Sequence, residues 1–72
     1  MSAQHEFYLA RAAEARATAQ AATLANVRNR WLLSEATWTD MAARSARSDT
    51  MRAKLATEKL SERAALALPQ LG

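Results

Sequence analysis

The chain contains no cysteine, one histidine, one glycine and one proline in its 72 residues. Without cysteine, no disulfide supports the fold and no thiol is available as a nucleophile. A single histidine, His5, is too little for a transition-metal site. Because Pro69 and Gly72 both fall near the end, residues 1–68 lack the two residue types that most often interrupt helices. These absences predict long helices without a disulfide or a bound metal.

Catalytic chemistry has equally little to build on. The chain has no glycine-rich loop to hold a phosphate. One pair of carboxylates at helical spacing, Glu58 and Glu62, lies in a charged stretch, which is typical of a solvated surface. We therefore expect a protein that is not an enzyme and that has no catalytic residue and no cofactor.

Long apolar runs are missing as well. The longest stretch without charge, 17–27, is about half the length of a membrane span. The first residues do not combine a basic start with an apolar run, as a secretory signal does. From these patterns we expect a cytoplasmic protein with no transmembrane helix.

Large apolar side chains are few, because alanine makes up most of the hydrophobic half of the composition. Alanine favours helices but removes little area from water when it is buried. A chain of this length with such a core is only marginally stable alone. Once disulfides and metals are excluded, self-association is the support that remains. We expect a homo-oligomer, in the simplest case a dimer.

A heptad seam of small residues marks the first helix. Five residues recur at alternating spacings of four and three: Tyr8, Ala12, Ala15, Ala19 and Ala22. Such spacing places its members on one face of a helix. Ser2 is a favoured N-cap residue, and Glu6 in the first turn complements the helix dipole. The pattern predicts a helix over about 3–23.

The best interior break lies just before Asn26, which is a favoured N-cap residue. We place a joint at 24–26, and a joint this short makes the two helices antiparallel. The second helix is expected over about 27–65, followed by a tail at 66–72. Its far half then has no partner in the same chain, so its apolar residues face water in a monomer.

A second break at 45–50, where Ser48 or Asp49 can cap a third helix, gives an alternative monomeric three-helix bundle. We favour the continuous helix, because this segment has no glycine to take the positive φ that a turn requires. The preferred architecture is all-α: an antiparallel helical hairpin with a longer second helix, dimerising into a four-helix bundle.

Two tryptophans, Trp31 and Trp38, lie seven residues apart and therefore about two turns apart on one stripe. Tryptophan is typical of binding hot spots. At helical spacing we interpret this pair first as packing residues against the alanine seam, partly at a subunit boundary. The expected core of the fold or of the dimer interface is Tyr8, Val27, Trp31, Trp38 and Met41.

The net charge of +3 belongs to the region from residue 25 onward, because the first helix is neutral. A modest positive charge with interleaved acids is usual for a solvated face. We expect a small interaction or regulatory module that binds another protein through a helical face, at the part of the second helix that the first does not reach. The candidate partner contacts are Arg44, Arg47, Met51, Lys54 and Leu55.

The alternative is a basic helical protein that associates with nucleic acid, its arginines tracking phosphates. We rank it second, because the chain lacks a helix-turn-helix with a glycine turn, a zinc-finger ligand set and a basic region before a leucine heptad. The arginines in question are Arg28, Arg30, Arg44, Arg47 and Arg52.

Three motifs carry a resemblance to a group of bacterial proteins: Tyr8-x-x-Arg-Ala, Leu24-Ala-Asn-Val-Arg-x-Arg and Trp38-x-x-Met-Ala-x-Arg. They lie in the segment from Tyr8 through Met51, and the match covers about two thirds of the chain. With these motifs the chain resembles short all-helical proteins of unknown function that recur in alphaproteobacteria. The resemblance implies a bacterial cytoplasmic origin and no particular mechanism.

Overall fold

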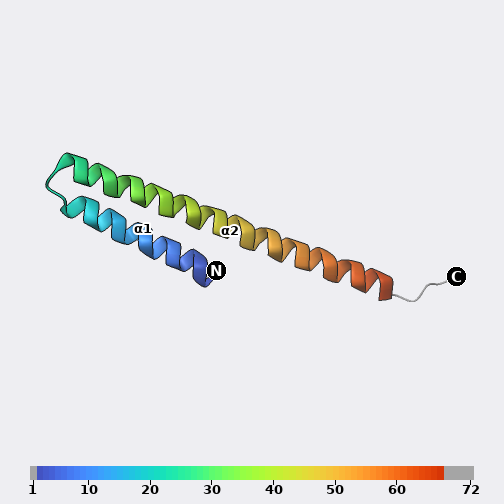
Figure 1. The fold of residues 1–72 in the computed structure, drawn as a ribbon. Coiled ribbons are helices and arrows are strands. Elements are labelled where there is room, and N and C mark those ends of the chain that lie inside the picture. Colours follow the sequence, from blue (N-terminus) through green and yellow to red (C-terminus); the bar gives the residue numbers. More distant parts are fainter. Residues whose placement is uncertain (1, 68–72) are drawn as a thin grey trace.

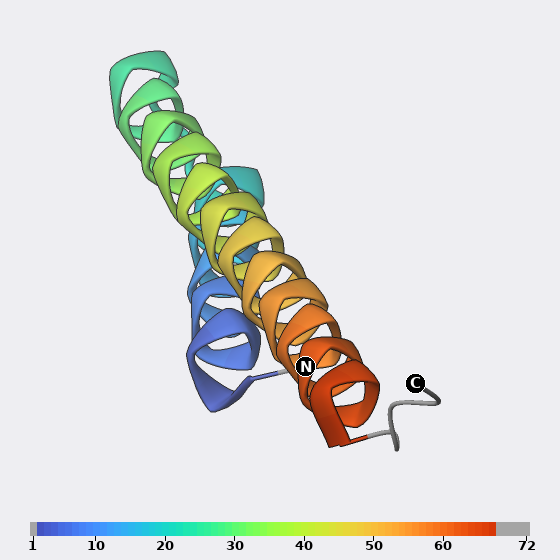
Figure 2. The ribbon, with the colours of Figure 1, turned by 90° about the vertical axis from the view of Figure 1, so that its right-hand side faces the viewer.

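The computed structural model describes residues 2–67, which form two α-helices joined by a short loop (Figure 1). Helix α1 is Ala3–Ala21 and helix α2 is Ala25–Ala67. The helices lie side by side and run antiparallel, and Figure 2 shows the same pairing viewed from the C-terminal end of α2. Residues 2–67 contain no strand. The predicted all-α hairpin with a longer second helix is confirmed.

The start of α1 follows the prediction from its sequence. Ser2 has an extended backbone (φ −72°, ψ 155°), and its side chain accepts a hydrogen bond of 3.2 Å from the His5 backbone N–H. Glu6 lies in the first turn. The Ser2 side chain thus accepts from the His5 N–H, which has no partner within the helix, as an N-cap residue does.

The joint between the helices lies two residues earlier than predicted. The loop comprises residues 22–24, so Asn26 is inside α2 and is not its N-cap. The first helical bond runs from the Arg28 N–H to the Leu24 carbonyl oxygen (3.0 Å). The Arg28 guanidinium also donates to the Ala22 carbonyl oxygen at 3.0 Å. This contact joins the first turn of α2 to the C-cap residue of α1, and it satisfies a carbonyl oxygen of the loop.

Helix α2 is continuous through residues 45–50, so the three-helix alternative is wrong and Ser48 and Asp49 cap no helix. None of residues 2–67 has the positive φ that a turn at this point requires. The helix also extends past the predicted end, because Leu66 and Ala67 are helical. The rest of the predicted tail, 68–72, lies outside the described residues.

The core between the helices is thin and consists mainly of alanine. The buried side chains are His5, Ala12, Ala15, Ala19, Ala42 and Ser45. Within the described residues, no large side chain is fully buried. Because stabilisation by burial scales with the apolar area removed from water, this hairpin gains little from its own core.

Helix α1 covers α2 only as far as about Asp49, beside which Ser2 lies. Residues 50–67 of α2 project beyond α1, and no other helix of the described part of the chain lies beside them (Figure 1). We call this segment the overhang. In the part of the chain that the structure describes, no helix has an apolar stretch long enough to cross a membrane.

Candidate functional site

One side of the hairpin carries an aromatic cluster centred on Trp38. The Phe7 ring meets the Trp38 ring edge-on at a centroid distance of 6.0 Å, and the Tyr8 ring lies 5.9 Å away at 33°. The Arg11 guanidinium carbon is 5.4 Å from the Trp38 ring centroid. Such aromatic pairs contribute about 0.5–1.5 kcal/mol each beyond area burial, and a cation over an indole adds to this. Three residues of α1 therefore hold Trp38 in one position.

Trp31 lies on the same side and is exposed, with 41% of its surface accessible, whereas Trp38 is half-buried. With Val27, Arg30 and Ser34, Trp31 lines a shallow groove of about 360 Å³. The α1 residues that share another groove with Trp31 are Arg11, Glu14, Ala15 and Thr18, so within residues 2–67 no aromatic ring of α1 packs on this second indole. The sequence predicts that the first helix covers both tryptophans. In the structure, α1 packs against Trp38 but leaves Trp31 partly exposed.

The five residues predicted as the core of the fold or interface line this one side of the hairpin and do not fill its centre. Val27, Trp38 and Tyr8 are half-buried, and Met41 is half-buried beside Tyr8 at the wall of a second groove of about 300 Å³. We call Tyr8, Val27, Trp31, Trp38 and Met41 the aromatic face. Their role in a dimer interface stays a prediction.

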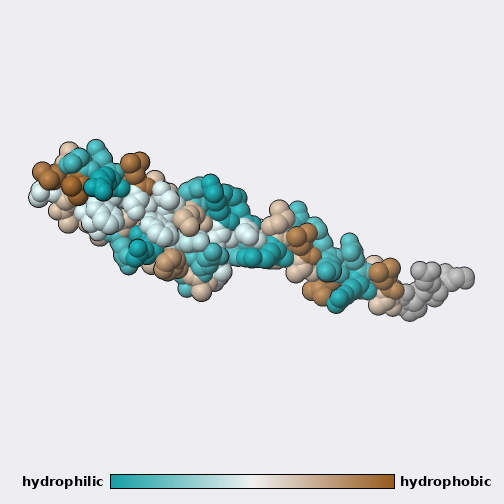
Figure 3. Space-filling view, viewed as in Figure 1, coloured by the Kyte–Doolittle hydropathy of each residue, from teal (hydrophilic) through white to brown (hydrophobic). Residues whose placement is uncertain are grey.

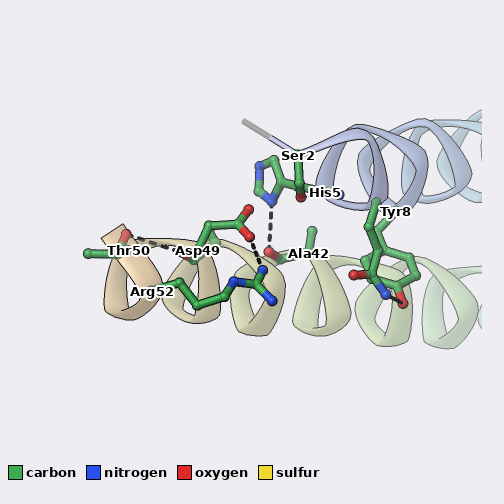
Figure 4. Close-up of polar contacts among 9 residues, drawn as sticks. Ser2, His5, Tyr8, Ala42, Asp49, Thr50 and Arg52 are labelled. Carbon is green, nitrogen blue, oxygen red and sulfur yellow. Dashed lines mark hydrogen bonds and ion pairs between the residues drawn. The ribbon is translucent and has the colours of Figure 1, made fainter. Parts of the chain in front are cut away.

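His5 occupies a core position that the sequence analysis missed. It is buried, and its Nδ1 lies 2.8 Å from the Ala42 carbonyl oxygen on the other helix (Figure 4). Because a carbonyl only accepts, Nδ1 carries the hydrogen in this contact. The signal was present: His5 precedes Tyr8 by three residues and so extends the heptad seam by one position.

Asp49 marks the point where cover by α1 ends. Its carboxylate forms an ion pair with Arg52 and points toward Ser2 at the start of α1 (Figure 4). The Ser2 hydroxyl, and after it the Arg52 guanidinium, hold the pKa of Asp49 below its ordinary value of 3.8. The positive end of the α1 dipole lies at the same place and also favours a carboxylate. Among residues 2–67, no group donates a hydrogen bond to its buried Oδ2.

The large aliphatic side chains of the overhang are exposed to solvent. The exposed fractions are Met51 56%, Leu55 55%, Leu60 65% and Leu66 86%. In Figure 3 hydrophobic patches alternate with hydrophilic ones along the overhang. Four large apolar side chains exposed along one segment that α1 does not cover favour an interaction surface.

The five predicted partner contacts lie on the half of α2 opposite Ala42, although Arg44 still borders Tyr8 of α1 at the second groove. Ala42 faces α1, and Met51 follows nine residues later, which at about 100° per residue is the opposite side. Arg44 pairs with Asp40 at 3.0 Å along the same helix. The set on this side, which we call the outer row, is Arg44, Arg47, Met51, Lys54 and Leu55.

The arginines proposed to track phosphates are largely engaged with the chain itself. Arg28 bonds to the loop, Arg44 pairs with Asp40, and Arg52 pairs with Asp49. The remaining two, Arg30 and Arg47, do not form a continuous basic track on their own. Nucleic-acid association stays a prediction of second rank.

No cluster of three or more potential metal-ligating side chains occurs within residues 2–67. No known family, no curated protein and no solved structure shows a significant match to this chain. The resemblance to short helical proteins of alphaproteobacteria therefore stays a prediction that rests on the three motifs alone. What the molecule offers to a partner has to be derived from its two surfaces, the aromatic face and the overhang.

Proposed function

We propose that this protein is a small, non-enzymatic interaction or regulatory module that binds another protein through a helical face. The overhang is the observation that carries this proposal. Its large apolar side chains stay in contact with water unless a partner covers them, which is unfavourable. More than half of the surface is exposed at Met51, Leu55, Leu60 and Leu66. Helix-in-groove and helix-on-helix pairing are common ways of covering such a segment.

The proposed module is a homodimer in which two hairpins pack into a four-helix bundle through their aromatic faces. The support for this arrangement is the thin alanine core of one hairpin together with the indole of Trp31, of which 41% is exposed beside a shallow groove. Face-to-face packing around a two-fold axis brings each tryptophan pair to the centre of the bundle. The overhangs then remain free for a partner, and the outer row supplies contacts to it.

The mass of the full chain in solution tests the dimer. Sedimentation equilibrium at micromolar concentration is expected to give twice the chain mass, and Trp31→Ala is expected to shift the dissociation constant at least tenfold, about 1.4 kcal/mol. Leu33→Ala serves as a matched control, because Leu33 is 70% exposed and is not part of the aromatic face. A folded monomer at these concentrations contradicts the dimer.

Quantitative affinity capture from the native cell tests the partner. We expect the double substitution Met51→Glu and Leu55→Glu to deplete the captured protein, whereas Thr50→Glu and Thr57→Glu, which change the charge equally on another side of α2, leave it bound. Capture of nucleic acid that is lost with increasing salt, in place of a protein, would support the alternative function.

A further inference from the structure

The large side chains of the overhang are spread over one half of its circumference, with Met51 and Leu60 at its two edges because they are nine residues apart. At about 100° per residue, this half contains every leucine of the overhang and three of its four basic residues. The large and basic residues on it are Met51, Arg52, Leu55, Lys59, Leu60, Arg63 and Leu66. Glu62 also lies on this half, near its Met51 edge, whereas the other half carries small or polar residues together with Lys54 and Glu58. The overhang is therefore amphipathic in a particular way, with cations lying between leucines.

A shallow groove of about 260 Å³ lies on this half, lined by Ala56, Lys59, Leu60 and Arg63. Ala56 and Leu60 form its apolar side, and Leu60 is 65% exposed. The two cations, four residues apart, form its other side. We call this the leucine–cation groove.

The cations of the groove are not used by the chain itself in the part that the structure describes. The four ion pairs within residues 2–67 involve Arg11, Arg16, Arg44 and Arg52 as the basic partners. Lys59 and Arg63 take part in none of them. Two adjacent cations beside an exposed leucine offer charge-assisted hydrogen bonds and apolar area to the same ligand.

We propose that the leucine–cation groove binds an amphipathic helix of another protein that carries two carboxylates one turn apart beside its apolar face. The proposal rests on the proposed function and names the chemistry of its partner. Carboxylates at i and i+4 have the same separation along a helix as Lys59 and Arg63, so each cation meets one acid. The apolar side chains of the partner helix cover Leu60 and Ala56.

A second copy of the chain is the competing occupant. Two grooves that faced each other directly would place Lys59 and Arg63 against the same cations of the other copy, and like charges brought together across an interface cost several kcal/mol. A copy shifted along the groove offers Glu58 and Glu62 instead, so a homodimer that dissociates in the Lys59→Gln and Arg63→Gln variant would assign the groove to the second copy and contradict the proposal. Nucleic acid fits less well, because phosphates make no use of the exposed leucines and the overhang also carries Glu58 and Glu62. An acidic helix satisfies both the charges and the apolar area.

Fluorescence anisotropy with labelled synthetic peptides tests the groove on the full-length protein. The first probe is a leucine- and alanine-rich amphipathic helix with glutamates at i and i+4 beside its apolar face. The second is the same peptide with glutamine at both positions. We expect the glutamate peptide to bind at least tenfold more tightly and its affinity to fall with salt.

Substitutions locate the binding on the groove. The double variant Lys59→Gln and Arg63→Gln is expected to weaken binding of the glutamate peptide at least tenfold, and Leu60→Ala is expected to weaken binding of both peptides. The matched control, Thr50→Glu and Thr57→Glu, lowers the net charge by the same two units on the opposite half of the overhang. It is expected to stay within twofold of the wild type. Far-ultraviolet circular dichroism confirms that each variant keeps its helix content.

Several results would overturn the proposal. They are equal binding of the two peptides, an equal loss of affinity in the groove variant and the control variant, or tighter binding of a labelled random DNA duplex than of the glutamate peptide. Sedimentation of the same samples separates this proposal from the proposed function. A dimer that ignores both peptides refutes the groove alone, whereas a monomer that binds the glutamate peptide refutes only the homodimer.

Discussion

The two halves of α2 belong to one unbroken helix but differ in how their side chains are covered by α1. In the covered half, up to Asp49, the buried side chains of α2 are the small ones of Ala42 and Ser45. Larger side chains of this half, such as Trp38, lie at the edge of the contact, where residues of α1 pack against them. In the overhang the large residues, such as Leu60, are more than half exposed because α1 does not reach them.

The difference teaches how this hairpin is held together. Alanines on both helices let the backbones approach closely, but such contacts bury little area. Specific contacts at the edge of the seam, such as those of Phe7 and Arg11 with Trp38, add the interactions that fix the register. The overhang has neither a close neighbour nor edge contacts, so it is the part of the molecule best suited to bind something else.

The largest expected effect comes from adding bulk to the covered half. Ala19 is 1% exposed, so Ala19→Leu forces the helices apart and is expected to lower the free energy of unfolding by about 2–3 kcal/mol. The matched change in the overhang, Ala53→Leu, is expected to stay within about 0.5 kcal/mol. Urea unfolding at one protein concentration measures both. Equal costs at the two positions would contradict the contrast between the halves.

Removing the edge contacts is expected to cost slightly less. Trp38→Ala deletes a half-buried indole with its two ring contacts, and we expect a loss of about 2 kcal/mol, below the ~3–5 kcal/mol typical of a fully buried aromatic. Thermal unfolding at constant concentration provides the measurement, with Phe7→Leu as a milder variant in the same cluster. A cost under about 1 kcal/mol would mean that α1 does not depend on Trp38 for its register.

The buried histidine tests the end of the covered half. His5→Ala removes the hydrogen bond to the Ala42 carbonyl oxygen and some packing, and we expect a loss of about 1 kcal/mol. His5→Gln, which retains a side-chain donor, is expected to recover part of it. Amide hydrogen exchange in the first turns of α1 should accelerate in the alanine variant. Unchanged exchange there would show that His5 contributes nothing to docking.

The smallest effect is expected from Asp49, at the boundary between the halves. A carboxyl group whose pKa is lower in the folded state adds stability above its unfolded-state value, near 3.8, and this is lost as the pH falls through the folded-state pKa. Asp49→Asn is therefore expected to be less stable than wild type at neutral pH, with the difference vanishing in acid. Urea unfolding across this pH range, with Asp40→Asn as the control, measures it. A difference that persists at low pH would point to a cause other than charge.

Much of the fold follows from local pattern. The heptad spacing correctly predicted that Ala12, Ala15 and Ala19 face the other helix, and Ser2 is the N-cap that its side chain and position suggest. The continuous α2 follows from the lack of a residue suited to a turn at 45–50. These features depend on residues a few positions apart, which is the range over which sequence patterns act.

The sites were less predictable, because they depend on which residues meet across the hairpin. Sequence spacing gave the stripe that holds Trp31 and Trp38, but the different cover of the two indoles depends on the α1 residue opposite each one. His5 contacts Ala42 on the other helix, and Arg28 contacts Ala22 across the loop, so both contacts form only in the folded hairpin. Extending the heptad seam back to His5 predicts the burial of this residue. No local sequence pattern predicts the contact of Arg28 with the loop.

The sequence by itself determined two helices, an alanine seam and an exposed apolar segment, because helix propensity, capping and periodicity are local properties of the chain. The tertiary structure decided the register of the hairpin, and with it the end of cover at Asp49. Contacts such as His5 with Ala42, 37 residues apart, set that register. Where α1 stops, the leucines and cations of α2 are left for a partner, and that boundary is a property of the packed helices alone.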